Sequence, residues 1–116
     1  MSSNVVIFHN PRCSKSRQTL ALLQDAGIEP EIVLYLEQPP TVSELGRIVR
    51  LLGIKPFDLV RTGESVYKEQ FKSRSLTDDE WLATLVDNPI LIQRPIVVAG
   101  EGAAIGRPPE AVLELL

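Results

Sequence analysis

The sequence predicts an α/β fold in which helices flank a four-stranded mixed sheet. Short apolar runs that suit buried strands occur at residues 5–8, 31–36, 94–99 and 103–106. Segments with helical spacing of apolar residues lie between these runs and after the last one. The order is therefore β-α-β, then helices, then β-β-α, and it predicts both parallel and antiparallel strand pairs.

The N-terminal part predicts a βαβ unit with parallel strands. Val5–Phe8 is fully apolar, and Pro11 follows it as a break because proline disfavours a helix at the residue before it. A helix is expected from about Ser14–Ala26, with Gly27 as its C-terminal stop. The second strand is expected over Glu31–Leu36.

Two helices in the middle of the chain each begin with a capping-box pattern, a Thr followed three residues later by a Glu. The two pairs are Thr41 with Glu44 and Thr77 with Glu80. The first of these helices is expected to end at Gly53, and the polar stretch 54–76 is expected to hold one or two short helices. Together they form a predicted helical insertion, about 41–88, within a single domain over residues 1–116.

The C-terminal part predicts a hairpin and a last helix. A third strand is expected over Arg94–Ala99, and Gly100–Gly102 can turn the chain into a fourth strand over 103–106. A helix then opens at Pro108, since proline suits a first helical turn. Its expected apolar face consists of Val112, Leu113, Leu115 and Leu116. This order of elements fits a thioredoxin-like fold.

Composition excludes several classes of function. A chain of 116 residues buries roughly two thirds of its unfolded surface, so it needs no metal or disulfide to fold. One Cys and one His exclude an internal disulfide and speak against a structural zinc site. A net charge of −3 gives no support for nucleic-acid binding. The absence of a signal-like N-terminus and of any apolar run near ~20 residues predicts a cytoplasmic protein without a membrane partner.

The single cysteine is the principal candidate for chemistry. Cys13 falls at the start of the first predicted helix, where free N–H groups and the helix dipole favour an anion. Such positions lower the pKa of a cysteine from ~8.5 to between roughly 3.5 and 7.5. Three nearby cations are expected to act in the same direction, and the N–H groups would also bind a tetrahedral oxyanion. The cations are Arg12, Lys15 and Arg17.

The spacing around Cys13 separates the alternatives. A buried structural cysteine would lie within an apolar stripe, whereas polar and basic residues flank this one. Arg17 gives Cys-x3-Arg rather than the Cys-x5-Arg of phosphatase loops, and Ser16 stands where a dithiol enzyme has its second cysteine. His9 lies only four residues upstream, which does not suit a cysteine protease. The pattern favours an enzyme with one thiol that takes its resolving thiol from another molecule.

The segment from His9 to Arg17 resembles the active-site loop of the glutaredoxin-linked arsenate reductase (ArsC) family. The resemblance covers almost the whole chain, and its blocks occur in family order. The further blocks are Leu34–Glu37 with Pro39-Pro40, then Arg61, then Asn88–Val98, and then Ile105–Glu110.

The resemblance implies a role for each matching residue. Cys13 matches the nucleophile, and three arginines match those that bind the arsenate or arsenite oxyanion: Arg61, Arg94 and Arg107. Four residues match those that orient the thiolate or support the loop: Ser16 and Arg17, and His9 and Asn10. Pro95 matches the cis-proline of thioredoxin-like folds, which would aim Arg94 at the site. The resemblance also implies glutathione as co-substrate, glutaredoxin as partner, and no tightly bound cofactor or metal.

The residues alone leave other functions open. Arginine forks match tetrahedral oxyanions, but Arg61 could equally be a solvated helix residue. A glutathione-linked thiol oxidoreductase could act on another oxyanion or on a mixed disulfide. A non-enzymatic regulator of the Spx type shares this fold and binds RNA polymerase, although such proteins usually carry the Cys-x-x-Cys that Ser16 replaces here.

Overall fold

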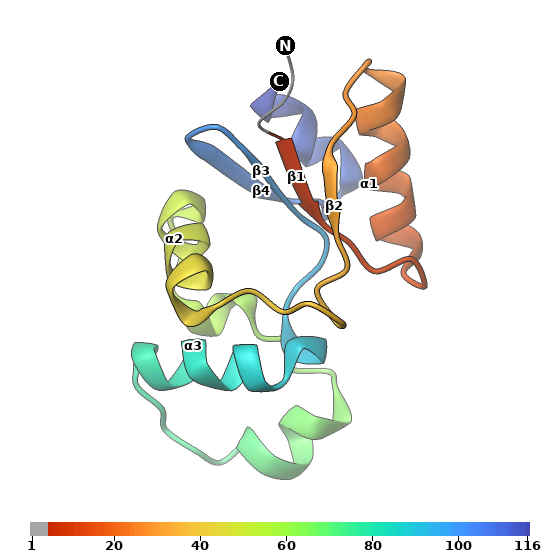
Figure 1. Cartoon of the computed structure of the whole chain (residues 1–116). Helices are drawn as coiled ribbons and strands as arrows, with labels where there is room; N and C mark the ends of the chain where they lie inside the picture. The colour runs from red at the N-terminus through yellow and green to blue at the C-terminus, as the bar shows by residue number, and fades with distance from the viewer. Residues whose placement is uncertain (1–4) are drawn as a thin grey trace. The chain divides into compact units, whose positions relative to one another are not determined.

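The computed structural model describes residues 5–116, which form two compact units. The first unit combines the described residues up to Gln38 with Arg94–Leu116, and the second unit is Pro39–Gln93. Both are drawn in Figure 1. Within residues 5–116, no helix has the length and apolar character needed to cross a membrane.

The first unit contains the predicted four-stranded mixed sheet, in the order β2-β1-β3-β4. β1 (Val5–Phe8) pairs in parallel with β2 (Glu31–Val33) and antiparallel with β3 (Ile96–Ala99). β3 pairs antiparallel with β4 (Gly102–Ile105). The central strand β1 thus joins the two halves of the sequence that make up this unit.

Two strands are shorter than the sequence predicted. β2 ends at Val33 rather than Leu36, because the carbonyl of Leu34 accepts hydrogen bonds from the amides of Glu37 and Gln38 and the chain turns there. β3 begins at Ile96 rather than Arg94, since Pro95 has no N–H to donate to a neighbouring strand.

Two helices cover one face of this sheet. α1 (Ser14–Asp25) begins and ends within one residue of the prediction, and η4 (Pro109–Leu115) follows the last strand. In Figure 1 both helices lie on the same side of the strands, where they enclose an apolar core. The core consists of Val5, Ile7 and Val97 from the strands with Leu23 and Val112 from the helices.

The last helix differs from the expectation in type and in its apolar face. η4 is a 3-10 helix, which has three residues per turn, so residues three apart share a side. Val112 is fully buried and Leu115 packs against the same core. Leu113 and Leu116 are exposed, and their prediction as part of the buried face is wrong.

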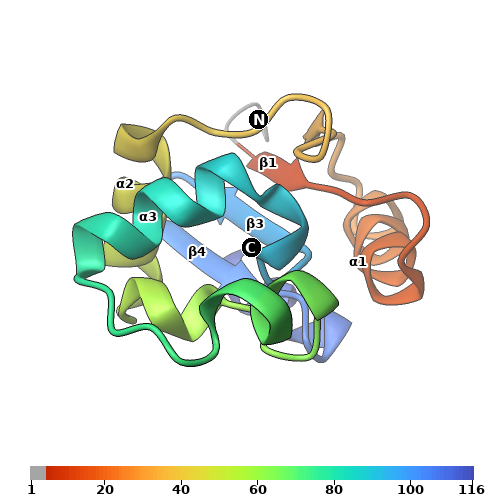
Figure 2. The same ribbon diagram turned by 90° about the horizontal axis from the view of Figure 1, so that it is seen from below.

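The second unit is helical, as Figure 2 shows. Both predicted capping boxes are present, at the starts of α2 (Val42–Leu52) and α3 (Asp78–Asp87). Gly53 ends α2 in the left-handed conformation, as expected. Three short helices complete the unit: η1 (Pro56–Leu59), η2 (Tyr67–Phe71) and η3 (Pro89–Leu91).

At Gly106 the chain packs closely against two other segments of the first unit, near the ends of its strands. A Cβ on Gly106 would overlap the hydroxyl of Thr19 in α1 and would lie 2.8 Å from Pro95 Cγ. The Gly106 amide donates to the Pro95 carbonyl at 2.8 Å, which holds the two segments together. Only a residue without a side chain allows this arrangement.

We expect Gly106→Ala to lower the free energy of unfolding by about 1–3 kcal/mol, because the added methyl group must displace Thr19 or Pro95. Gly46→Ala is the matched control. Gly46 lies inside α2, where alanine is favoured over glycine by roughly 0.5–1 kcal/mol. A Cβ at this position would lie an ordinary 3.6 Å from the side chain of Leu82. Denaturant unfolding of both variants measures the difference, and a Gly106→Ala variant as stable as the wild type would contradict the packing argument.

Candidate active site

The turn before α1 places Cys13 at the helix N-terminus, as the sequence predicted. Cys13 is the N-cap residue of α1 and has an extended backbone. Its amide donates to the Asn10 carbonyl at 3.0 Å, and the Asn10 side-chain oxygen accepts the Arg12 amide at 3.0 Å. Both ends of the turn around Pro11 are therefore held by Asn10.

A buried polar network ties this loop to the first turn of α1. The Ser16 hydroxyl is fully buried, lies 2.6 Å from His9 Nδ1 and accepts the Asn10 amide at 3.0 Å. The Arg17 guanidinium donates to the Pro11 carbonyl at 2.8 Å. Burial, and secondly the charge of Arg17, lower the pKa of His9 below its ordinary value, which favours the neutral imidazole.

The thiol of Cys13 is half-buried and its pKa lies below the ordinary value. Burial raises this pKa. The backbone N–H of Ser16, a hydrogen bond from the Arg94 side chain, the backbone N–H of Lys15 and the Arg94 charge lower it, and together they outweigh the effect of burial. The structure thus agrees with the expected direction of the shift.

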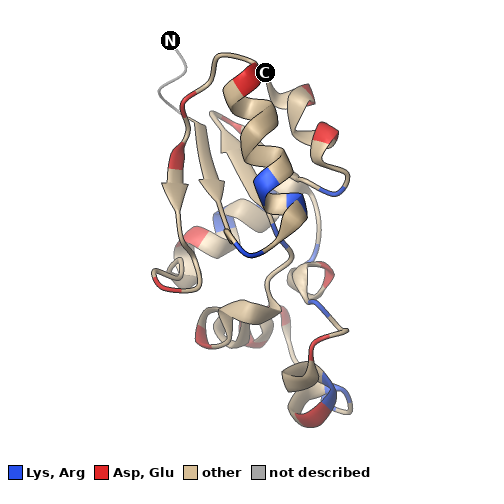
Figure 3. Ribbon diagram, turned by 90° about the vertical axis from the view of Figure 1, so that its right-hand side faces the viewer, with Lys and Arg blue, Asp and Glu red and all other residues tan. Residues whose placement is uncertain are grey.

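The cause of that shift differs in part from the sequence prediction. Basic residues do gather at the N-terminal end of α1, as Figure 3 shows. The side chains of Arg12, Lys15 and Arg17 are nevertheless absent from the interactions that lower the pKa of Cys13. Arg12 and Lys15 are exposed, where solvent screens their charges, and Arg17 is bound to the loop carbonyl instead.

Two of the three predicted arginines lie at the thiol. Arg107 Nη2 is 3.9 Å from Cys13 Sγ, and Arg107 Nε donates to the Arg94 carbonyl at 2.8 Å. Arg94 Nε and Nη1 are buried and have no hydrogen-bond partner among residues 5–116. Buried donors without partners are unfavourable, and an oxyanion at this position would satisfy them.

Each of these arginines precedes a cis-proline. The Arg94–Pro95 peptide bond is cis, as the resemblance implied. The Arg107–Pro108 bond is also cis, and no sequence pattern predicted this.

Arg61 belongs to the second unit. Its Nε lies 3.4 Å from Glu64 Oε2, and its amide donates to the Leu91 carbonyl at 2.7 Å. Arg61 lies outside any helix and its side chain is only 23% exposed, which is unlike a solvated helix residue. Its participation in an oxyanion site with Arg94 and Arg107 stays a prediction.

Two further residues position the site and were not predicted from the sequence. Thr19 is fully buried and its hydroxyl donates to the Lys15 carbonyl at 2.8 Å, within the turn that carries the thiol. Gly106 provides the close approach described above. The available signal was the spacing of Ser16, Thr19 and Leu23, which places two small polar residues on the buried face of α1.

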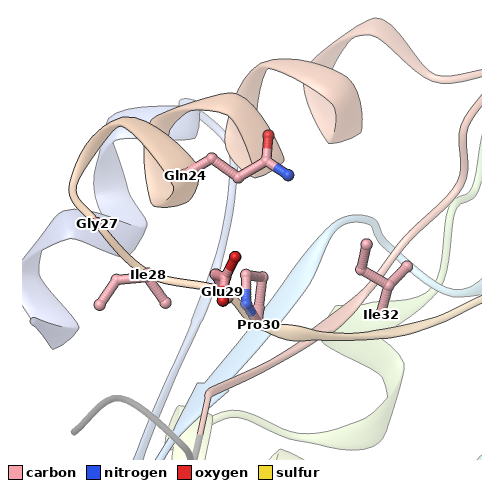
Figure 4. A pocket seen from close by; sticks show the side chains of 6 residues that line it. All are labelled: Gln24, Gly27, Ile28, Glu29, Pro30 and Ile32. Carbon is pink, nitrogen blue, oxygen red and sulfur yellow. The ribbon is translucent and has the colours of Figure 1, made fainter.

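A separate cavity lies at the opposite end of α1, as Figure 4 shows. Its volume is about 520 Å³, and residues between Gln24 and Ile32 line it. Glu29 is the one charged side chain of this lining, which contains no nucleophile. Nowhere in residues 5–116 do three or more His, Cys, Asp or Glu side chains gather as metal ligands would.

We expect Arg94→Ala to raise the pKa of Cys13, because Arg94 stabilises the thiolate through both a hydrogen bond and its charge. Lys15→Gln should leave this pKa unchanged, since Lys15 acts through a backbone N–H that the substitution retains. The rate of alkylation by iodoacetamide as a function of pH gives the midpoint for each variant. Equal midpoints for Arg94→Ala and wild type would show that the arginine does not act on the thiol.

Comparison with known proteins agrees with this fold. A sequence model of the ArsC family matches residues 8–115. The chain is 49% identical over 118 residues to the Escherichia coli (strain K12) protein YfgD, covering 100% of this chain and 99% of that protein. It is 46% identical over 115 residues to the Haemophilus influenzae protein named arsenate reductase, covering 97% of this chain and 99% of that protein.

A solved structure of arsenate reductase from Vibrio cholerae superposes with a TM-score of 0.95 at 48% identity, covering 100% of both chains. The four-stranded mixed sheet and this superposition confirm the predicted thioredoxin-like fold. The family model, the alignment with the Haemophilus influenzae relative and the superposition each cover nearly the full length of the chain. The chain therefore belongs to the ArsC family.

Proposed function

We propose that this protein is an arsenate reductase in which Cys13 is the nucleophile. One observation carries the proposal: a cysteine with a lowered pKa receives a hydrogen bond from Arg94, whose Nε and Nη1 are buried without partners in the described part of the chain. A nucleophile and two donors for an anion therefore occur at one place. The name of the Haemophilus influenzae relative supports arsenate as the anion.

Binding of the oxyanion would use the two arginines at the thiol. Guanidinium forks stay charged at any relevant pH and pair with two oxygens at once. Arg94 and Arg107 would thus offset the repulsion between a thiolate and an arsenate dianion, and Arg61 would add a third fork. The N–H groups at the start of α1 favour the same negative charge.

The first step is displacement at arsenic. The Cys13 sulfur forms a bond to arsenic, and one arsenic–hydroxyl bond breaks. The hydroxide takes a proton from solvent and leaves as water. Arginines that hold the remaining oxygens stabilise the charge that gathers on them during this exchange.

Reduction then needs two further thiols, for which we propose glutathione and glutaredoxin. Glutathione displaces a second hydroxide from arsenic, which leaves as water with the thiol proton. A glutaredoxin thiolate attacks the glutathione sulfur, a disulfide forms, and the sulfur–arsenic bond breaks with its electron pair left on arsenic. As(V) becomes As(III) while two thiols are oxidised, and water then displaces Cys13 and releases arsenite.

We expect Cys13→Ser to abolish arsenate-dependent NADPH oxidation in an assay with glutathione, glutaredoxin and glutathione reductase. Arg107→Ala should lower kcat/KM for arsenate by on the order of 10²-fold, the loss typical when one donor to a developing charge is removed. Arg47→Ala, which removes an exposed arginine of α2, is the matched control and should retain turnover.

Turnover that survives in Cys13→Ser would contradict the assignment of the nucleophile. If the wild type shows no arsenate turnover while Cys13 alkylates rapidly, the thiol acts on a different substrate.

A further inference from the structure

A second cavity borders the loop that carries the nucleophile. Its volume is about 210 Å³. One wall is the loop of residues 9–12, directly before Cys13, and the other wall is formed by Leu34, Leu36 and Glu37 in the turn after β2. The reaction described above assigns no role to this cavity.

Backbone hydrogen bonds hold both walls in place. The His9 amide donates to the Val33 carbonyl at 2.8 Å and joins the two walls. The Leu34 carbonyl accepts the amides of Glu37 and Gln38, which shapes the turn opposite the loop. The cavity is therefore formed before any ligand binds, and a ligand would not need to order it.

The walls carry opposite charges that have no protein partners. Arg12 lies on the loop wall and Glu37 on the turn wall, and both are exposed. Within residues 5–116, neither side chain forms an ion pair or a hydrogen bond. The side chains of Leu34 and Leu36 supply apolar lining beside these charges.

We propose that this cavity binds the γ-glutamyl end of glutathione. That end carries an α-ammonium and an α-carboxylate on one carbon, because the peptide bond of glutathione uses the γ-carboxyl group. Arg12 would bind the carboxylate and Glu37 the ammonium, while the leucines contact the methylene groups. The glycine end offers only a carboxylate and would leave Glu37 unpaired.

The size and place of the cavity fit part of a tripeptide. Sites that enclose a drug-sized ligand have volumes of about 300–1,000 Å³, so this cavity suits one end of such a molecule. Cys13 follows Arg12 directly in the sequence, so the wall of the cavity ends one residue before the thiol. The inference rests on the proposed function through its use of glutathione as thiol donor.

The test uses a reaction of Cys13 that needs no arsenate. The Cys13 thiolate attacks one sulfur of oxidised glutathione, the disulfide breaks, a mixed disulfide forms, and glutathione leaves as a thiolate. Hydroxyethyl disulfide reacts in the same way but has no charged groups. The measurement is the ratio of the two rate constants, glutathione disulfide over hydroxyethyl disulfide, followed by mass spectrometry of the intact protein.

We expect Glu37→Gln to lower this ratio by about threefold to fivefold, the effect of losing one exposed ion pair. The matched control is Glu31→Gln, which removes an equal charge from an exposed position in β2 outside the cavity. Oxidised glutathione that lacks the α-ammonium should react more slowly than the natural disulfide with the wild type and at an equal rate with Glu37→Gln.

Equal ratios for Glu37→Gln and Glu31→Gln would overturn the proposal. A higher ratio for Glu37→Gln would also overturn it, because it would indicate that the cavity receives the glycine carboxylate. The assay is independent of arsenate turnover. If the wild type reduces arsenate but Glu37→Gln leaves the ratio of rate constants unchanged, glutathione binding in this cavity is rejected and the proposed function stands. If the ratios change as expected but the wild type does not reduce arsenate, arsenate is rejected as the substrate and glutathione binding in the cavity stands.

Discussion

The candidate site depends on one close contact at which α1, the segment before β3 and the segment after β4 meet. Gly106 lies against Thr19 and Pro95 with no space for a side chain. Each of these residues is near a functional group in sequence: Thr19 in the helix that Cys13 caps, Pro95 next to Arg94, and Gly106 next to Arg107. Because close-packed interiors do not deform continuously, this contact determines how far the thiol lies from both guanidinium groups.

The electrostatics of the thiol follow from that geometry rather than from the number of surrounding cations. The charges of the exposed cations near Cys13 are screened by solvent, whereas backbone N–H groups and a buried guanidinium act on the sulfur in fixed positions. Burial alone would make Cys13 a poor nucleophile, so the donors must be in place before substrate arrives. The network of Ser16 with His9 and Asn10 holds the loop in the conformation that permits this.

The sequence predicted what local chemistry determines and missed what depends on distant contacts. Capping boxes, a helix-terminating Gly53 and the strand-to-helix turn at Cys13 follow from neighbouring residues, and all are present. Two features were not predicted. β2 ends early because the Leu34 carbonyl accepts hydrogen bonds that turn the chain, and η4 is a 3-10 helix, which places Leu113 outside the core. No local pattern shows that Gly106 will meet a helix more than eighty residues upstream.

Ser16 explains why a second molecule must take part in any redox cycle at this site. It stands where a dithiol enzyme has its resolving cysteine, and its hydroxyl is fully engaged by His9 and the Asn10 amide. The position is structural here, and Cys13 is the one cysteine in the chain. Both electrons for a net reduction must therefore come from outside the chain, and in the proposed reaction an external thiol must reach the protein surface beside Cys13. The preformed cavity between the loop and the β2 turn borders the residues directly before the nucleophile, and its two opposite charges suit a zwitterion better than a simple anion.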